Sequence, residues 1–355
     1  MQSHSGHLCP AMELSSLRIL ILSKAKFHVP ASVVSTIIEY LSRPLHRQCL
    51  GTSNCHTAAI DSDGFVLLHG MRPRQHQQVR SARSVSLAVG YSHIVSLTNR
   101  GDLLCCGMNQ YHQCEVPPFA PRAVLVSAGD WHTVAVTECG DLVCFGSNKH
   151  SQCDLPPRMD TVVSVECGSI HTSVVTARGQ LRCFGNNTYG ECDVPPGLGE
   201  VSAFSSRHHH TCAVTTSGQV VCFGRNYEGQ CNVPADLEPV YQISAGMEHT
   251  CVITRSGRLV CWGSNAFGKC DVPSNLRFGA RSVVAGPLHT CVLDRSGRLH
   301  CFGLNDRGQC DVPVGLSTVT SVDAACAHTA VLCADGQSLV FGDNLCGQCM
   351  PCRLA

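Results

Sequence analysis

The chain has 355 residues, of which 26 are Lys or Arg and 26 are Asp or Glu, so its formal net charge is zero. This balance gives no overall attraction to nucleic acid or to an anionic membrane, and we expect neither as a partner. No apolar stretch is long enough to span a bilayer. Charged residues make up only 15% of the chain, well below the usual quarter, which indicates elements buried on both faces.

Residues 1–48 form an N-terminal extension. Within it, VPASVVSTIIEYLSRP predicts one amphipathic helix ending before Pro44, with apolar residues at Val33, Val34, Ile37, Ile38 and Leu41. We expect this helix to cap the rest of the protein; the same residues also bear a short resemblance to the first helix of an F-box, which docks onto ubiquitin-ligase scaffolds. The preceding apolar run is interrupted by Arg18 and does not read as a secretion signal. We therefore expect a cytoplasmic protein, with the nucleus as the alternative.

Residues 49–355 are built from a repeat of about 39 residues. A Phe-Gly motif or close variant recurs with its glycine at positions 107, 146, 185, 224, 263, 303 and 342, and a weaker copy, DSDGFVLLHG, ends at Gly70. Around Gly146, HTVAV predicts a strand, TECG a tight turn and DLVCFG a second strand, before a proline that excludes a central strand. Short strands at regular spacing predict an all-β fold, and repeats of this length fit a β-propeller.

The strand before each turn, with the residues that precede it, carries a recognisable signature. VSAGDWHTVAV (126–136) and ISAGMEHTCVI (243–253) resemble regulator of chromosome condensation repeats, and FGxNxxGQCDVP resembles the short-repeat β-lactamase inhibitor proteins of type II in the same superfamily. Two units depart from the signature, with Arg207 and Ala325 in place of its glycine. The resemblance implies a propeller of seven blades, closed by pairing of its terminal strands. The weak first copy is then either an eighth blade or an appendage.

Cysteine is the anomaly of the composition, with 26 residues. One set stands two residues before the motif glycine, at 105, 144, 183, 222, 261 and 301, and a second stands seven after it, at 114, 153, 192, 231, 270, 310 and 349. Three interpretations are open: small buried packing residues, disulfides within a blade, and a metal site. Zinc needs four converging ligands and this spacing offers two per blade, so we expect packing and no metal.

Histidine and asparagine also follow the repeat. Histidine stands at 93, 132, 171, 210, 249, 289 and 328, and asparagine at 109, 148, 187, 226, 265, 305 and 344. Catalytic constellations are asymmetric, so residues present in every unit are expected to be structural. We expect each imidazole to anchor its own loop through a backbone hydrogen bond. We expect each asparagine to adopt a left-handed conformation and to bond its own backbone.

The informative positions are the two residues between the glycine position and the histidine. On a propeller these pairs fall on one rim of every blade and form a single surface. Tyr91 and Trp131 are side chains of the kind that anchor interfaces, and the inhibitor resemblance implies partner-binding aromatics at these positions. The alternative is that the pairs are ordinary variable loop residues. The predicted partner-binding residues are Tyr91, Asp130, Trp131, Ile170, His208, His209, Glu248 and Leu288.

No nucleophile with its base, no phosphate-binding loop and no HExxH motif stands out from the repeat, so we expect no enzyme activity and no cofactor. The sequence predicts a monomeric, non-catalytic β-propeller scaffold that binds a protein partner through loops on one face. Two alternatives are open. One is guanine-nucleotide exchange on a small GTPase, which the resemblance implies. The other is a substrate-receptor subunit of a ubiquitin ligase, with the N-terminal helix as adaptor.

Overall fold

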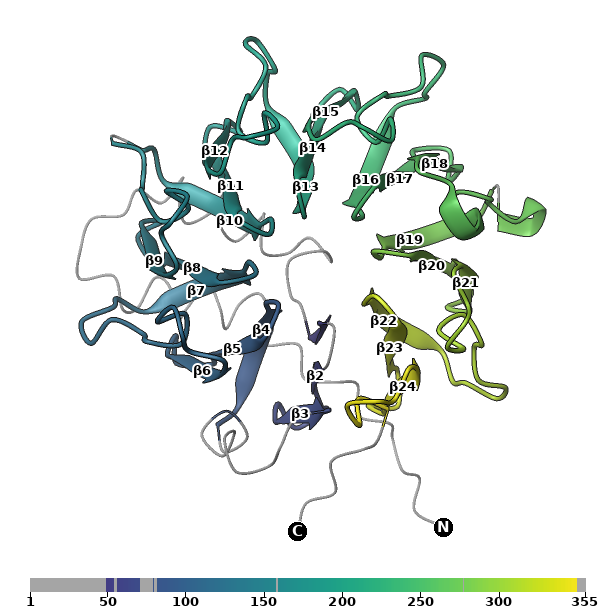
Figure 1. The fold of residues 1–355 in the computed structure, drawn as a ribbon, viewed down its shortest axis with the longest axis horizontal. Helices are drawn as coiled ribbons and strands as arrows, with labels where there is room; N and C mark the ends of the chain where they lie inside the picture. The colour runs from purple at the N-terminus through teal and green to yellow at the C-terminus, as the bar shows by residue number, and fades with distance from the viewer. Residues whose placement is uncertain are drawn as a thin grey trace, which may run out of the picture.

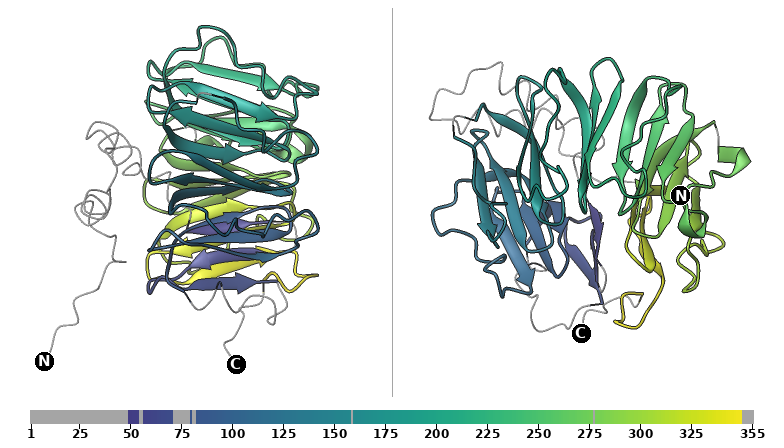
Figure 2. Two further views of the ribbon diagram at one scale, coloured as in Figure 1. Left: turned by 90° about the vertical axis from the view of Figure 1, so that its left-hand side faces the viewer. Right: turned by 45° about the horizontal axis from the view of Figure 1, so that its top comes forward.

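The computed structural model describes residues 49–53, 56–70, 79, 82–157, 159–276 and 278–349. The predicted N-terminal helix lies outside these residues. The described chain folds into eight three-stranded antiparallel sheets. The sheets are arranged as blades around a central axis, and side views show them stacked against one another along the ring (Figures 1 and 2). The all-β propeller predicted from the repeat is confirmed, with eight blades.

We number the blades 1 to 8 in chain order. Every blade is a meander whose first strand lies nearest the axis (Figure 1). The first strands are β1 (Leu50–Thr52), β4 (Ser84–Val89), β7 (Ala123–Ala128), β10 (Val162–Cys167), β13 (Val201–Arg207), β16 (Val240–Ala245), β19 (Ala280–Ala285) and β22 (Val319–Ala324). The middle strands are β2 (Thr57–Ile60), β5 (His93–Thr98), β8 (His132–Thr137), β11 (His171–Thr176), β14 (His210–Thr215), β17 (His249–Thr254), β20 (His289–Asp294) and β23 (His328–Cys333). The outer strands are β3 (Val66–His69), β6 (Leu103–Gly107), β9 (Leu142–Gly146), β12 (Leu181–Gly185), β15 (Val220–Gly224), β18 (Leu259–Gly263), β21 (Leu299–Gly303) and β24 (Ser338–Gly342). Two short 3-10 turns, η2 (Ala266–Gly268) and η3 (Ser274–Leu276), lie between β18 and β19.

The weak first copy of the repeat is a complete blade. Strands β1, β2 and β3 form their own sheet, and β1 packs against the last blade. The Asp323 carboxylate in β22 accepts hydrogen bonds from the backbone N–H and the hydroxyl of Thr52, at 2.8 and 3.0 Å. Closure by pairing of the terminal strands, which the resemblance implied, is therefore wrong. Among the described residues β24 pairs with β23 alone, and side-chain bonds close the ring.

The core lies between the blades rather than within one layer. All six residues are buried in β5, β8, β11, β14 and β17, because each middle strand is covered by a blade on both sides. One apolar cluster runs from Val134 through Val174 and Phe184 to Phe204, and so joins three consecutive blades. This burial on both faces explains why so few charged residues occur in the chain.

The Phe-Gly motif ends the outer strand for two physical reasons. Phe145 is buried, as are its counterparts Phe184 and Phe223. Gly146 lies opposite His132 across the ladder, with φ of +111°. A Cβ at this position would lie 2.6 Å from the carbonyl oxygen of Trp131, so only glycine fits.

Candidate protein-binding face

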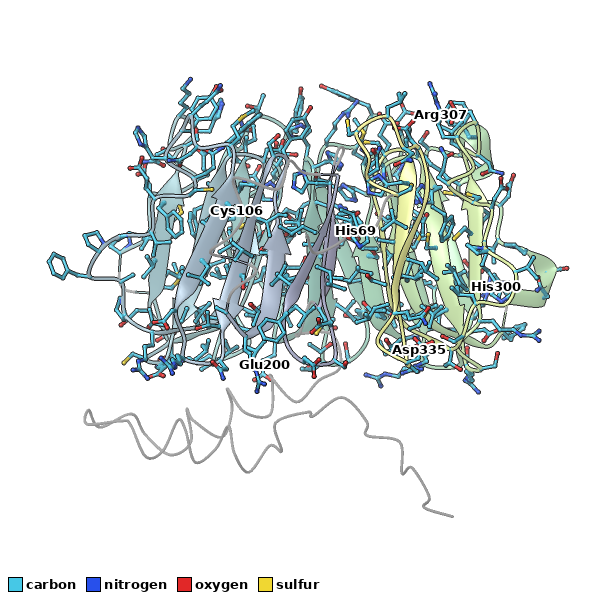
Figure 3. All side chains as sticks on the ribbon, turned by 90° about the horizontal axis from the view of Figure 1, so that it is seen from below. His69, Cys106, Glu200, His300, Arg307 and Asp335 are labelled. Atoms are coloured by element: carbon cyan, nitrogen blue, oxygen red, sulfur yellow. A yellow bond between two sulfur atoms is a disulfide. The ribbon has the colours of Figure 1, made fainter. Side chains whose placement is uncertain are left out.

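In blades 2–8, two loops emerge at the same end of the ring. The inner loop joins the first strand to the middle strand and holds the variable pair before the histidine; the outer loop follows the outer strand. In blade 3 they are residues 129–131 and 147–154, and they meet because His132 is paired with Gly146. We call this end the loop face. Figure 3 places Arg307, an outer-loop residue, at this end and Glu200 and Asp335 at the opposite end.

The repeated histidine links each blade to the next one. His93 Nε2 lies 2.9 Å from the hydroxyl of Thr133 in the following blade. The corresponding pairs are His132–Thr172, His171–Thr211, His210–Thr250, His249–Thr290, His289–Thr329 and, across the closure of the ring, His328–Thr57. The expected backbone bond to its own loop is wrong: the imidazole acts between blades. At the remaining interface, between blades 1 and 2, Ile94 stands where the threonine is found elsewhere.

Burial fixes the protonation of His93 and His132. The Thr133 hydroxyl donates its proton to the carbonyl of Gln113 at 3.0 Å, so it must accept from His93 Nε2–H. His93 Nδ1 has no hydrogen-bond partner among the described residues. Burial lowers the pKa of His93 to about 4 and that of His132 to about 3. These two imidazoles are therefore neutral at physiological pH and serve as structural links.

The outer loop is held in one shape by its asparagine. Asn305 Oδ1 accepts the backbone N–H of Cys310 at 2.8 Å, and its Nδ2 donates to Asp311 at 2.8 Å. The asparagine thus bonds its own backbone, as expected. The left-handed residue is a different one, three positions further on: Gly308 has φ of +77°, and His112 and Ser151 adopt the same conformation in blades 2 and 3. The predicted left-handed asparagine is therefore wrong.

Backbone hydrogen bonds connect the inner loops of three consecutive blades. The Asp130 N–H donates to the carbonyl of Ser169 at 2.9 Å, and the Ser169 N–H donates to the carbonyl of His208 at 3.1 Å. Burial raises the pKa of Asp130 above its usual value. His208 stands in a tight hairpin at φ of +50°, and burial lowers its pKa to about 3. The inner loops that hold Asp130, Ile170 and His208 are thus hydrogen-bonded to one another.

A first aromatic cluster covers blades 2 and 3. The rings of Tyr91 and Trp131, both predicted from the sequence, lie 5.2 Å apart between centroids. Tyr111 of the outer loop packs edge-on against Trp131 at 5.4 Å. Lys149 places its ammonium 4.8 Å from the ring centroid of Tyr111. Inner and outer loops of neighbouring blades therefore combine into one aromatic surface.

A second aromatic cluster lies over blades 4 and 5. Tyr189 packs edge-on against His209 at 5.6 Å and against Tyr227 at 5.7 Å. The guanidinium of Arg225 lies 5.4 Å from the centroid of Tyr227. Tyr227 is 73% exposed and Tyr189 40% exposed, so the cluster faces solvent. In blade 6 the outer loop continues the row with Phe267, which is 61% exposed.

Polar and charged side chains contact the second cluster. Glu191 is fully buried; its Oε2 accepts the Tyr189 N–H at 2.8 Å, and its Oε1 lies 3.4 Å from His209 Nδ1. Glu248 lies 3.6 Å from Arg225 and 3.7 Å from the buried ammonium of Lys269. Both Glu191 and Lys269 occupy the outer-loop position that is glutamine at residues 113, 152, 230, 309 and 348.

The two aliphatic residues of the predicted set are placed differently. Ile170 and Leu288 are half-buried. Their carbonyls accept hydrogen bonds from the outer-loop N–H groups of Asn186 and Leu304, both at 3.0 Å. The same bond is made by the carbonyls of Trp131, His209 and Glu248. The structure brings Tyr91 together with Trp131 and joins His209 to Glu248 through the second cluster, whereas Ile170 and Leu288 belong to neither aromatic cluster.

Arg207, which breaks the repeat signature, crosses the central axis. From blade 5 its guanidinium reaches the carbonyls of Ala285 in blade 7 and Ala324 in blade 8, at 3.4 and 3.3 Å. It also lies 3.7 Å from the Asp323 carboxylate. Burial raises the pKa of Glu166 to about 7, which a hydrogen bond from Ser206 N–H and the charge of Arg207 oppose. Arg207 thus links blade 5 to blades 7 and 8 across the central axis.

The outer loops give the loop face a negative character. Exposed carboxylates stand on the described outer loops at Glu115, Asp154, Asp193, Glu228, Asp271, Asp306 and Asp311. The exposed lysine and arginine side chains of these loops are Lys149 and Arg307. Such a face attracts a positively charged partner.

Cysteines lie at the edge of the loop face, where outer strand meets outer loop. Cys144 and Cys153 of blade 3 form a disulfide, whereas the equivalent cysteines of blades 2 and 4–7 are thiols. The described residues contain no group of three or more His, Cys, Asp or Glu arranged to hold a metal ion. Within the same residues, no helix has both the length and the apolar character needed to cross a membrane. Disulfide and packing roles therefore both occur.

Comparison with known proteins decides the kind of propeller. The family model of the regulator of chromosome condensation (RCC1) repeat matches residues 85–113, 123–152, 162–191, 208–230, 240–269 and 280–309. The chain is an RCC1-repeat β-propeller. The structure adds blades 1 and 8, which complete the ring on either side of the matched repeats. No curated protein is similar in sequence.

Solved structures share the fold of this RCC1 propeller at low sequence identity. Prp20p from Saccharomyces cerevisiae, described with its binding to Gsp1p and histones, is 16% identical, with a TM-score of 0.59 over 88% of this chain and 94% of that one. The ectodomain of the Arabidopsis thaliana receptor kinase ACR4 is 18% identical, with a TM-score of 0.57 over 76% and 97%. Human WBSCR16 is 18% identical, with a TM-score of 0.55 over 71% and 87%.

The sequence interpretation missed the outer-loop aromatics. It treated the segment after the motif glycine as a structural turn, yet Tyr111, Tyr189, Tyr227 and Phe267 stand there and three of them are exposed. The signal was present: an aromatic recurs three or four residues after the motif glycine in four units. Inner and outer loops meet only when the strand register is known, which is why the repeat alone pointed to half of the face.

Proposed function

We propose that this RCC1 propeller is a non-catalytic, monomeric scaffold whose loop face binds a basic surface of a protein partner. The observation that carries the proposal is the pair of aromatic clusters formed by Tyr91, Trp131, Tyr189 and Tyr227 on adjoining blades. Exposed aromatic side chains held in place by their neighbours are the usual anchors of protein interfaces.

The acidic outer loops give the partner its character. Carboxylates around an aromatic centre suit arginine and lysine side chains, which form ion pairs with the carboxylates and stack on the rings. The inner loops are already bonded to one another from Asp130 to His208, so binding orders few side chains. Cytoplasmic residence, with the nucleus as the alternative, is part of the same proposal and is checked by imaging the tagged chain.

Affinity purification followed by mass spectrometry tests the proposal. The comparison is between the wild-type chain and the double variant Trp131→Ala/Tyr227→Ala. The control is Phe278→Ala, which removes an exposed aromatic that is bridged to Arg258, away from the loop face. A specific partner should be recovered with the wild type and the control, and lost by about tenfold or more with the double variant. Equal recovery with all three chains would exclude the loop face.

Binding to the purified partner should also weaken as salt is raised, because the acidic loops contribute ion pairs. A salt-independent affinity would contradict the basic character of the partner while leaving the aromatic anchor in place.

Nucleotide exchange on a small GTPase is the second candidate function. The fold is shared with Prp20p, which is described with its binding to Gsp1p. Release of labelled GDP from candidate GTPases is the test, and acceleration by this chain would replace the non-catalytic proposal. A ubiquitin-ligase receptor role would instead show as ligase subunits that are lost when residues 1–48 are removed.

A further inference from the structure

Blades 5, 6 and 7 each carry a third cysteine that the two-cysteine repeat does not explain. Cys212 lies directly opposite Cys222 on the neighbouring strand, Cys251 opposite Cys261, and Cys291 opposite Cys301. In blade 7 the two sulfur atoms are 3.2 Å apart. In blades 2, 3 and 4 the same position is Val95, Val134 and Ser173.

The repeated pair of cysteines occupies one geometry in every blade that has it. In blade 3, Cys153 N–H donates to Asn148 Oδ1 at 2.9 Å, and this pair is a disulfide. Cys231 N–H donates to Asn226 Oδ1 at 2.8 Å, and equivalent bonds hold Cys270 and Cys310. The loop thiols of blades 5–7 are therefore presented to their strand thiols by the same turn that allows the bond in blade 3.

Three thiols thus converge within each of these blades. The strand cysteine, for example Cys222, lies between the loop cysteine Cys231 and the buried Cys212. The backbone geometry supports the grouping, since Cys222 is paired with Cys212 in register and stands nine residues before Cys231, as Cys144 does before Cys153. The loop thiol is half-buried and so within reach of a small oxidant, whereas Cys212 is fully buried.

We propose that blades 5, 6 and 7 are thiol–disulfide sites, in each of which three cysteines share one disulfide. A low-molecular-weight disulfide such as oxidised glutathione supplies the oxidation. The loop thiolate attacks one of its sulfurs and releases one thiol; the strand thiolate then attacks the mixed disulfide, forms the Cys222–Cys231 bond and releases the second thiol. Two electrons pass to the glutathione disulfide, which leaves as two reduced thiols.

The third cysteine allows the bond to move without further oxidation. The Cys212 thiolate attacks the sulfur of Cys222, the Cys212–Cys222 bond forms, the Cys222–Cys231 bond breaks, and Cys231 leaves as a thiolate that takes up the proton lost by Cys212. The first disulfide ties the outer loop, which carries Tyr227, to its strand; the second releases that loop. Blade 3 lacks the third thiol, so its disulfide stays in place.

The reaction should be slow at neutral pH. Burial raises the pKa of Cys231, Cys270 and Cys310 to about 12, so each is protonated at physiological pH. Because the thiolate is the reactive form, the rate of oxidation should increase about tenfold for each unit by which the pH is raised, as long as the pH stays below that pKa. These cysteines should therefore stay reduced during a brief exposure to an oxidant and become oxidised only during a prolonged one.

Disulfide mapping of the full chain tests the proposal. The folded protein is incubated with oxidised glutathione at about pH 9, where the thiolate fraction is measurable, then quenched with acid, alkylated and digested with trypsin without reduction. Trypsin cuts after Arg225, so a Cys222–Cys231 bond joins two peptides, whereas Cys212 and Cys222 lie in one peptide and their bond lowers its mass by two hydrogens. Both species should appear in blade 5. In blades 6 and 7 trypsin also cuts between the buried cysteine and the strand cysteine, at Arg255 and Arg295, so both bonds should appear there as linked peptides.

The control variant is Cys212→Val, which places in blade 5 the residue that blade 3 has at this position. It should form the Cys222–Cys231 bond and lose the intrapeptide species. In blade 4, which has Ser173 at this position, the Cys183–Cys192 disulfide should be the single species in every sample exposed to the oxidant. Full alkylation of Cys222, Cys231, Cys261 and Cys270 after exposure to the oxidant would overturn the proposal, and so would disulfides that join different blades.

Discussion

At the scale of single residues, the sequence predicted that the repeated histidine anchors its own loop, whereas in the structure it links neighbouring blades. His210 Nε2–H donates to Thr250, and the Thr250 hydroxyl in turn donates to the carbonyl of Gln230 at 2.9 Å. His210 is buried, so the threonine satisfies a donor that would otherwise lack a partner, whereas the Gln230 carbonyl also accepts the Trp262 Nε1–H at 3.0 Å. The sequence could show that histidine and threonine recur, but not that they belong to different blades.

Thr250→Val should destabilise the protein by about 1–3 kcal/mol, because it leaves the His210 donor buried without its partner. Urea unfolding followed by circular dichroism measures the change. Thr216→Val is the matched control: this threonine is exposed and should cost less than about 0.5 kcal/mol. Equal effects of the two substitutions would refute the role of the bond.

At the scale of the element, the outer loop shows how far sequence reasoning reaches. The asparagine was correctly predicted to bond its own loop backbone, because a short amide has few other uses in a Gly-rich turn. The left-handed residue was misplaced, because both asparagine and glycine tolerate that conformation and the sequence does not show which of them adopts it. The aromatic residues of the loop were missed because their exposure depends on packing between blades.

Ser151→Gly should stabilise the protein by about 0.5–1 kcal/mol. Ser151 has φ of +61°, and the same position is glycine in blades 4–8, so glycine removes backbone strain that exceeds its entropic cost. Chemical denaturation measures the change. Ser151→Ala keeps the strain and should give no gain; a gain with alanine as large as that with glycine would contradict this explanation.

At the scale of the whole molecule, the sequence predicted the architecture because seven copies of one pattern agree. It left the count between seven and eight, since the first copy has lost its Phe-Gly motif but keeps His56 and Thr57, which the sequence interpretation did not align with the others. The closure could not be predicted. It depends on contacts between residues such as Thr52 and Asp323, 271 positions apart.

Asp323→Ala should open this closure. It leaves the Thr52 N–H without its acceptor and removes the carboxylate beside Arg207, which keeps the carbonyls of Ala285 and Ala324. The substitution should cost about 2–3 kcal/mol. Hydrogen exchange should rise mainly in blades 1 and 8. Ser244→Ala removes one acceptor, from the Ala285 N–H, at an ordinary interface and should have a smaller effect. Exchange that rises evenly around the ring would show that the closure is no weaker than the other interfaces.

Acid should unfold the ring through its buried histidines. The pKa of His93, His132, His171 and His328 is lowered to about 3 or 4, from 6.5 in the unfolded chain. As pH falls through 6.5 the unfolded chain gains protons that the folded chain does not, so stability present above pH 6.5 is lost towards pH 4. The loss is about 2 kcal/mol per histidine at pH 5.

Unfolding free energies measured from pH 8 to pH 4.5 check this expectation. His93→Gln, which keeps a side-chain donor for Thr133, should reduce the loss between about pH 7 and pH 5 by about 2 kcal/mol. A wild-type stability that is flat over this range would contradict the neutral, buried state of the histidines.

The closure between blade 8 and blade 1 also bears on how the ring would respond to mechanical load. Within a blade, tension is shared among the rungs of a β-ladder, whereas at the closure it falls on separate side-chain bonds such as His328–Thr57 and Asp323–Thr52. A pulling force applied between residues 50 and 342 would break these closure bonds before it sheared any sheet. Released there, the ring would become an open arc, and its blades could then peel away one after another.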